Sequence, residues 1–270
     1  MRQQREQAAL KRRSIPEDLW KRTLVRYGFL RRRSPDEAAE LRRLTSLFLD
    51  NKEFSAAGGL HLTDAMAVAI AAQAVLPVLK LGLARYDSFV GIVVHPGQVT
   101  ARREVTDEDG LVHAYDEVLA GEAMQGGPIM LSWQDVRAAG PMAAHGYNVV
   151  IHEFAHVLDL ADGLADGVPL LPPELSRQDW LNTLRSSYQA FVTQVQGAEE
   201  SGTDTAIDPY GAESEDEFFA VTSEAFFANP QMLEREQAAL YSLFKRFYQQ
   251  DPARDIAPRH AAAPAQEPES

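Results

Sequence analysis

The segment Asn148-Val-Val-Ile-His-Glu-Phe-Ala-His-Val-Leu-Asp159 decides the expected fold, because it combines an HExxH motif with the signals of a helix. His152 and His156 are four residues apart, and only an α-helix brings side chains at that spacing to one face. Asn148 is a favourable N-cap, and the apolar residues around the motif give the helix a side to bury. The segment therefore predicts a helix that presents two imidazoles side by side.

The same motif predicts a zinc site with a general base. His152 and His156 are candidate ligands, since imidazole is a common zinc ligand. Glu153 lies one position round the helix, where its carboxylate can reach a water on the metal rather than the metal itself. We expect one Zn²⁺ per chain and peptide-bond hydrolysis. The competing interpretation is an amphipathic helix that carries two histidines and a solvated Glu without a metal.

The residues alone leave the third zinc ligand open. A catalytic zinc normally has three protein ligands, and the chain has no Cys to supply one. Asp162 holds the third-ligand position of the longer HExxHxxGxxH pattern, but Asp159 stands where that pattern requires Gly. Glu217 and Glu224, seven residues apart, lie nearly on one face of a second predicted helix. Ser214 and Glu217 also form a capping box, which would explain Glu217 without a metal.

Composition excludes several classes of protein. The formal net charge of −13 argues against a nucleic-acid surface. The longest apolar run, residues 65–79, contains Gln73 and Pro77 and is shorter than the roughly 20 residues that cross a bilayer. The N-terminus lacks the apolar stretch of a secretory signal, so we expect a cytoplasmic protein with no membrane partner and no direct nucleic-acid partner. The basic residues at 11–13 and 31–33 are interpreted as solvated charge, with partner binding as the alternative.

Local patterns predict an α+β fold that is predominantly helical and has a small mixed β-sheet. Capping boxes at 14–17 and 34–37 predict two early helices, and a third is expected to follow Thr63. Short β-rich runs at 89–94 and 129–133 predict the sheet. Further helices are expected at 148–161, 177–195, 215–228 and 231–249. We divide the chain into a basic helical extension (1–34), one catalytic domain (35–251) and a disordered tail (252–270), which is rich in Ala, Pro and charge.

Segments beyond the HExxH motif match a known family, in order, over most of residues 35–252. They are residues 76–83, 110–113, 126–129 with Trp133, 148–159, 207–210, 217–227 and 247–252. The chain resembles the Mlc titration factor A family of zinc peptidases and, more distantly, the catalytic domain of anthrax lethal factor. This resemblance implies a zincin-like fold with an HExxH active-site helix.

The resemblance also implies roles for single residues. In that family zinc is held by the two motif histidines and a Glu seven residues after a Tyr, which implies His152, His156 and Glu217 here. Tyr210 would donate to the oxyanion of the reaction, and Glu224 would support the ligands from behind. The family implies aminopeptidase-like cleavage of peptides and binding of an Mlc-type transcriptional repressor that controls the glucose phosphotransferase system. The alternative is a non-catalytic module that titrates a repressor, with zinc serving structure.

A few further expectations concern residues near the motif. Asp159 is expected either to hold the His156 ring or to face solvent. The strand at 128–133 is a candidate for pairing with an extended peptide along a free edge. His95 and His113 are interpreted as turn or core residues rather than ligands.

Overall fold

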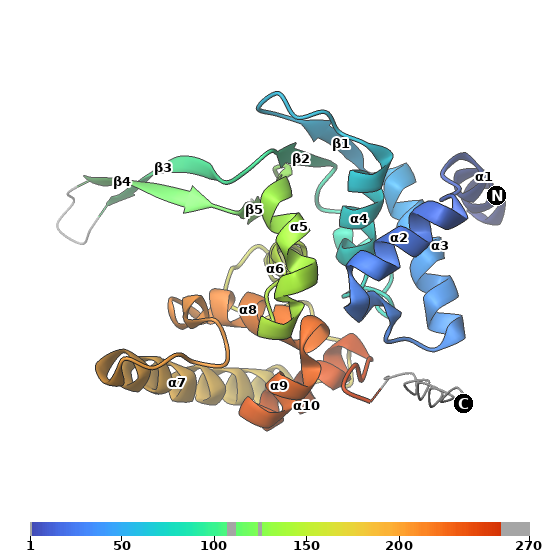
Figure 1. Ribbon diagram of the computed structural model, residues 1–270. Coiled ribbons are helices and arrows are strands. Elements are labelled where there is room, and N and C mark those ends of the chain that lie inside the picture. The colour runs from blue at the N-terminus through green and yellow to red at the C-terminus, as the bar shows by residue number, and fades with distance from the viewer. Residues whose placement is uncertain (1, 107–111, 124–125, 255–270) are drawn as a thin grey trace, which may run out of the picture.

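The computed structural model describes residues 2–106, 112–123 and 126–254, and for residues 2, 100–106 and 112–119 it describes the backbone alone. The fold is mostly helical with a small mixed sheet, which confirms the predicted α+β, zincin-like class (Figure 1). The helices are α1 (Arg2–Arg12), α2 (Glu17–Arg26), α3 (Pro35–Asn51), α4 (Asp64–Ala74), α5 (Trp133–Met142), α6 (Val149–Asp159), α7 (Arg177–Ser201), α8 (Glu215–Ala228), α9 (Pro230–Glu236) and α10 (Ala238–Tyr248). The strands are β1 (Glu53–Ala56), β2 (Gly91–His95), β3 (Val99–Thr106), β4 (Val112–Leu119), β5 (Gly121–Ala123) and β6 (Ile129–Ser132).

Four strands form the main sheet in the order β1-β2-β6-β5. β1, β2 and β6 are parallel, while β5 runs antiparallel to β6, with Gly121 opposite Leu131. β3 and β4 pair with each other as a separate hairpin that projects from the body of the molecule (Figure 1). The predicted free edge at 128–133 is wrong, because β6 lies between β2 and β5 and is paired on both sides. β5 lies at the end of the sheet instead.

The helix α6 lies at the centre of the fold, against α8, α4 and β5. Phe154 anchors it, because its ring lies 4.9 Å from Tyr86, 5.6 Å from Phe89 and 5.7 Å from Phe48 between ring centroids. All four rings are buried, and burying one Phe side chain stabilises a protein by about 1.5–3 kcal/mol. The motif helix is therefore fixed by the core on the side that does not carry His152 and His156.

Capping residues explain where several helices begin. The predicted capping box at Ser34 and Glu37 is present at α3. As expected, α4 begins directly after Thr63, and the Thr63 side chain caps it. The predicted box at 14–17 is wrong, because α2 begins at Glu17 with Pro16 as its N-cap and has no side-chain cap. The helix expected at 231–249 is two helices, because Gln237 leaves the helical conformation at φ −139° and ψ 60°.

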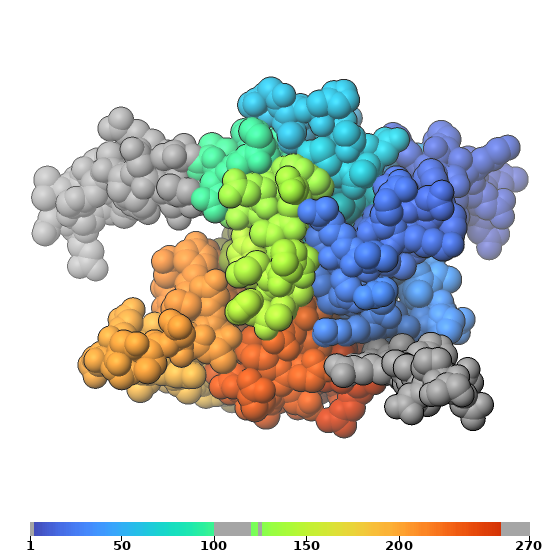
Figure 2. Space-filling model, in the orientation of Figure 1, coloured from blue at the N-terminus to red at the C-terminus, as the bar shows by residue number. Residues whose placement is uncertain are grey.

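The N-terminal extension packs against the rest of the chain. Trp20, Tyr27 and Phe29 belong to the same buried cluster as the aromatic residues around α6. The Tyr27 hydroxyl donates to the carbonyl of Val136 in α5 at 3.1 Å. Figure 2 shows that the N-terminal segment, in blue, also lies against α5, in yellow-green, at the surface of the molecule. The boundary at residue 34 stays a prediction.

At the other end, Arg254 forms an ion pair with Glu234 at 2.8 Å. Residues 255–270, most of the predicted disordered tail, lie outside the described residues. Among the residues that are described, none of the helices has the length and apolar character needed to cross a membrane.

Candidate metal centre

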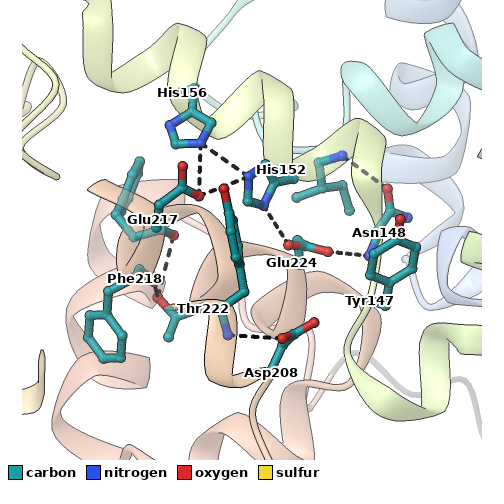
Figure 3. Close-up of polar contacts among 12 residues, drawn as sticks. Tyr147, Asn148, His152, His156, Asp208, Glu217, Phe218, Thr222 and Glu224 are labelled. Carbon is teal, nitrogen blue, oxygen red and sulfur yellow. Dashed lines mark hydrogen bonds and ion pairs between the residues drawn. The ribbon is translucent and has the colours of Figure 1, made fainter. Parts of the chain in front are cut away.

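Three side chains from two helices converge on one point. His152 Nε2 and His156 Nε2 of α6 lie 3.1 and 3.4 Å from Glu217 Oε2 of α8, and 3.1 Å from each other (Figure 3). Among the described residues, these three form the one group of His, Asp and Glu side chains whose ligand atoms could hold a metal ion, all within 4.8 Å. The helix predicted from the motif therefore presents its two imidazoles toward the carboxylate of Glu217, which lies 61 positions after His156 in the chain.

Glu224 fixes the protonation of the His152 ring. Its Oε1 lies 2.8 Å from His152 Nδ1, and its Oε2 accepts a hydrogen bond from the backbone N–H of Asn148. A carboxylate only accepts hydrogen bonds, so Nδ1 carries the proton of the neutral ring. The lone pair of that ring is then on Nε2, the atom that faces Glu217.

The arrangement fits a metal ion. Atoms bound tetrahedrally to zinc at 2.0–2.1 Å lie about 3.3 Å apart, which matches the spacing of the three converging atoms. Glu217 Oε2 is buried and accepts no hydrogen bond of normal geometry.

Burial raises the pKa of Glu217, but the two imidazoles outweigh burial and hold that pKa below its usual range. Burial lowers the pKa of His152, and the carboxylates of Glu217 and Glu224 hold it well above the usual value. The site thus attracts positive charge.

Glu153 lies on a neighbouring stripe of α6 and is 4% exposed. Its carboxylate is next to Gly121 of β5, so it lies between the motif helix and the end strand of the sheet. Burial raises the pKa of Glu153 to about 7. A carboxylate with a pKa in that range can both accept and release a proton near neutral pH, as general acid–base chemistry requires.

Comparison with known proteins assigns the chain to a family. Residues 1–249 match the family described as "Glucose-regulated metallo-peptidase M90". The chain belongs to this M90 family. It is 38% identical over 220 residues to a protein named "Mlc titration factor A" of Pectobacterium atrosepticum, with 81% of each chain covered. It is 37% identical over 224 residues to the protein of that name in Klebsiella pneumoniae (strain 342), with 83% of each chain covered. An uncharacterized protein of Synechocystis sp. is 36% identical over 229 residues, which cover 84% of this chain and 82% of the relative.

In this M90 member, the two other candidates for a third ligand lie elsewhere. The Asp162 carboxylate accepts a hydrogen bond from the backbone N–H of Leu164 and is outside the converging group. Glu224 contacts the far side of the His152 ring. The Ser214 hydroxyl caps α8 through the Glu217 backbone N–H, while the Glu217 carboxylate faces the imidazoles. The cap and the converging carboxylate are therefore compatible.

Other residues singled out in the sequence have mixed outcomes. The Tyr210 ring lies beside His152, with centroids 6.1 Å apart, and is 38% exposed.

Asp159 is wholly buried rather than solvent-facing, and burial raises its pKa to about 7. Its Oδ2 accepts from the Gly167 N–H at 3.0 Å and its Oδ1 has no partner, so the expected support of His156 is not found. His95 ends β2, and the side chain of His113 lies outside the described part of the chain.

One residue that supports the motif helix was missed from the sequence. Gln73 of α4 is wholly buried and its Oε1 accepts from Asn148 Nδ2 at 2.9 Å. That bond orients the Asn148 amide so that its Oδ1 caps the Ile151 N–H at the start of the motif helix. A polar residue inside the apolar run 65–79 was the available signal, because buried polar groups almost always have hydrogen-bond partners.

Proposed function

We propose that this chain is a zinc-dependent peptidase of the aminopeptidase-like kind, with His152, His156 and Glu217 as the zinc ligands. One observation carries the proposal: three side-chain atoms that could bind a metal ion converge, and two of them come from the HExxH helix, which also carries the buried carboxylate of Glu153. Two imidazoles and one carboxylate form a donor set typical of catalytic zinc, which keeps a fourth position for water or substrate. The M90 family membership supports the same class of reaction.

The residues around the centre divide the chemistry between them. A bound zinc ion would supply a water of lowered pKa and polarise the scissile carbonyl. Glu153 accepts a proton from the attacking water and delivers it to the leaving amine. Tyr210, beside the His152 ring, donates a hydrogen bond to the oxyanion as it develops. Glu224 keeps the Nε2 lone pair of His152 directed at the ligand position.

For the peptide substrate we propose β5 as the pairing strand. It lies at the end of the sheet, next to Glu153, and replaces the edge expected at 128–133. An extended peptide that adds to such a strand gains main-chain hydrogen bonds without requiring a particular sequence.

Removal of the metal with a chelator distinguishes a catalytic role of zinc from a structural one. We expect a chelator to abolish hydrolysis of an aminoacyl anilide, and added zinc to restore it. Circular dichroism should still show the helices, because Phe154 anchors the motif helix through Phe48, Tyr86 and Phe89, none of which belongs to the converging group. The melting temperature should fall as the bound metal is lost. Loss of helical signal on chelation would favour the alternative in which zinc serves structure. Hydrolysis that resists chelation would contradict the proposal.

Glu224→Gln tests the support of His152. Both carboxylate oxygens face hydrogen donors, His152 Nδ1–H on one side and the Asn148 N–H on the other. A Gln amide can satisfy only one of them, because its NH₂ group would face the other donor. We expect zinc affinity to fall about 10–100-fold in a chelator-competition titration. An unchanged affinity would show that the Glu224 contact does not tune the site.

A second candidate function is binding of an Mlc-type repressor. It rests on the name "Mlc titration factor A" of the relatives in Pectobacterium and Klebsiella. We propose it as an additional role, in which the chain binds the repressor protein and contacts no nucleic acid itself. The cytoplasmic location stays a prediction. It agrees with this second role, because a transcriptional repressor acts in the cytoplasm of a bacterium.

A further inference from the structure

Gly121 of β5 lies directly under the Glu153 side chain. A Cβ atom built on Gly121 would be 2.3 Å from Glu153 Oε1 and 2.6 Å from both its Cδ and its Cγ. Side-chain Cβ atoms in proteins essentially never approach another heavy atom more closely than 3.0 Å. The space that any other residue would fill at this position is therefore occupied by the end of the Glu153 side chain.

The backbone gives no separate reason for glycine here. Gly121 is not among the glycines with positive φ, such as Gly126 and Gly146, so its backbone is open to any L-residue. A glycine in a strand at ordinary φ is normally less favourable than alanine, because it orders more backbone freedom on folding. What disfavours a larger residue at this position is the Glu153 side chain, which occupies the space that a Cβ atom would need.

Neither backbone can easily move away from a larger residue. Gly121 is held in register against Leu131 by the pairing of β5 with β6, and Leu131 is buried. The helix α6 is fixed by the aromatic cluster around Phe154. Rotation of the carboxylate alone would not relieve the contact, because Glu153 Cγ is as close as Cδ. The Glu153 side chain must therefore change its rotamer.

We infer that Gly121 is a positioning residue for Glu153: by leaving its own side-chain volume empty, it holds the carboxylate between β5 and the converging histidines. The inference rests on the proposed function, because it concerns the general base of that reaction. The position of the general base then depends on two elements of the fold. The HExxH helix carries Glu153, and β5 of the sheet provides the space in which its side chain lies.

Gly121→Ala tests this role in the full chain. We expect bound zinc to be unchanged by metal analysis, KM for an aminoacyl anilide to change little, and kcat to fall about 100-fold, the cost of misplacing a catalytic group by about 1 Å. Gly91→Ala is the matched control in the same sheet. A Cβ there would be 3.7 Å from Pro128 Cβ, which is ordinary contact. Wild-type kcat in Gly121→Ala would overturn the inference.

A double-mutant cycle distinguishes positioning from general damage. In the Glu153→Gln background the base is already lost, so Gly121→Ala should reduce kcat by less than about 2-fold more, because residues that act as a unit are not additive. An equal fold-loss in both backgrounds would contradict positioning.

Melting temperatures provide a readout that does not depend on hydrolysis. Gly121→Ala should lower the melting temperature of the wild type by about 2–4 °C. In the Glu153→Ala background it should leave the melting temperature unchanged or raise it, since the space is then free. If the wild type hydrolyses no peptide, the proposed function fails and the melting temperatures still decide whether the contact exists. If Gly121→Ala alone does not fold, recovery of folding in the double variant supports the contact, and failure of both overturns it.

Discussion

Replacing Glu217 by Ala is expected to remove the bound metal and, with it, all peptide hydrolysis. Glu217 Oε2 is the atom at which the two imidazoles of α6 converge, at 3.1 and 3.4 Å. Without it two histidines remain, and a two-ligand site holds zinc far more weakly than the three-ligand sites of catalytic zinc. Metal analysis of the purified variant should give close to zero zinc per chain, against one for the wild type.

A second Glu of the same helix provides the control. Glu215 lies in the first turn of α8 and pairs with Arg185 at 3.2 Å, away from the imidazoles. Glu215→Ala should keep its zinc and its activity. The Glu217→Ala variant should also remain folded, because Ser214 caps α8 through the backbone N–H of residue 217. Equal zinc in the two variants would remove Glu217 from the ligand set.

Glu153→Gln is expected to reduce kcat/KM for peptide hydrolysis by about 10²–10⁴-fold, the usual contribution of a general base. The amide has nearly the shape of the carboxylate but cannot accept the proton of the attacking water. Zinc content should be unchanged, because the converging group consists of His152, His156 and Glu217. Steady-state kinetics and metal analysis on the same preparation measure both quantities.

The same variant separates hydrolysis from repressor binding. If the repressor is bound by a surface that does not depend on catalysis, Glu153→Gln should still bind it in a titration with the purified repressor. Loss of both properties would contradict this separation. Full hydrolysis by Glu153→Gln would show that another group acts as the base.

The sequence was most informative where chemistry and helical periodicity coincide. The cap at Asn148 and the motif spacing predicted α6, and the range predicted for α8, 215–228, agrees with the structure. The pattern of residues alone could not choose among Asp162, Glu217 and Glu224, because that choice depends on how α8 crosses α6. The family resemblance favoured Glu217, which is the carboxylate that the fold brings to both imidazoles.

Features set by contacts between distant segments were missed. The order of the strands made β5 rather than β6 the end strand, and a three-residue strand has little local signal. Nothing in the local sequence distinguishes Gly121 from a glycine in a turn. Its contact with the Glu153 side chain appears only in the folded structure. Asp159 follows His156 by one helical turn, yet its carboxylate bonds to the loop at Gly167. These outcomes depend on tertiary packing, which local periodicity does not encode.

The most direct test of the central claim is X-ray diffraction from crystals of the zinc-loaded protein, measured on both sides of the zinc absorption edge. We predict one anomalous peak per chain, at bonding distance from His152 Nε2, His156 Nε2 and Glu217 Oε2 together. A peak bound by Glu224 or Asp162 instead of Glu217, or no peak on α6 at all, would contradict the account.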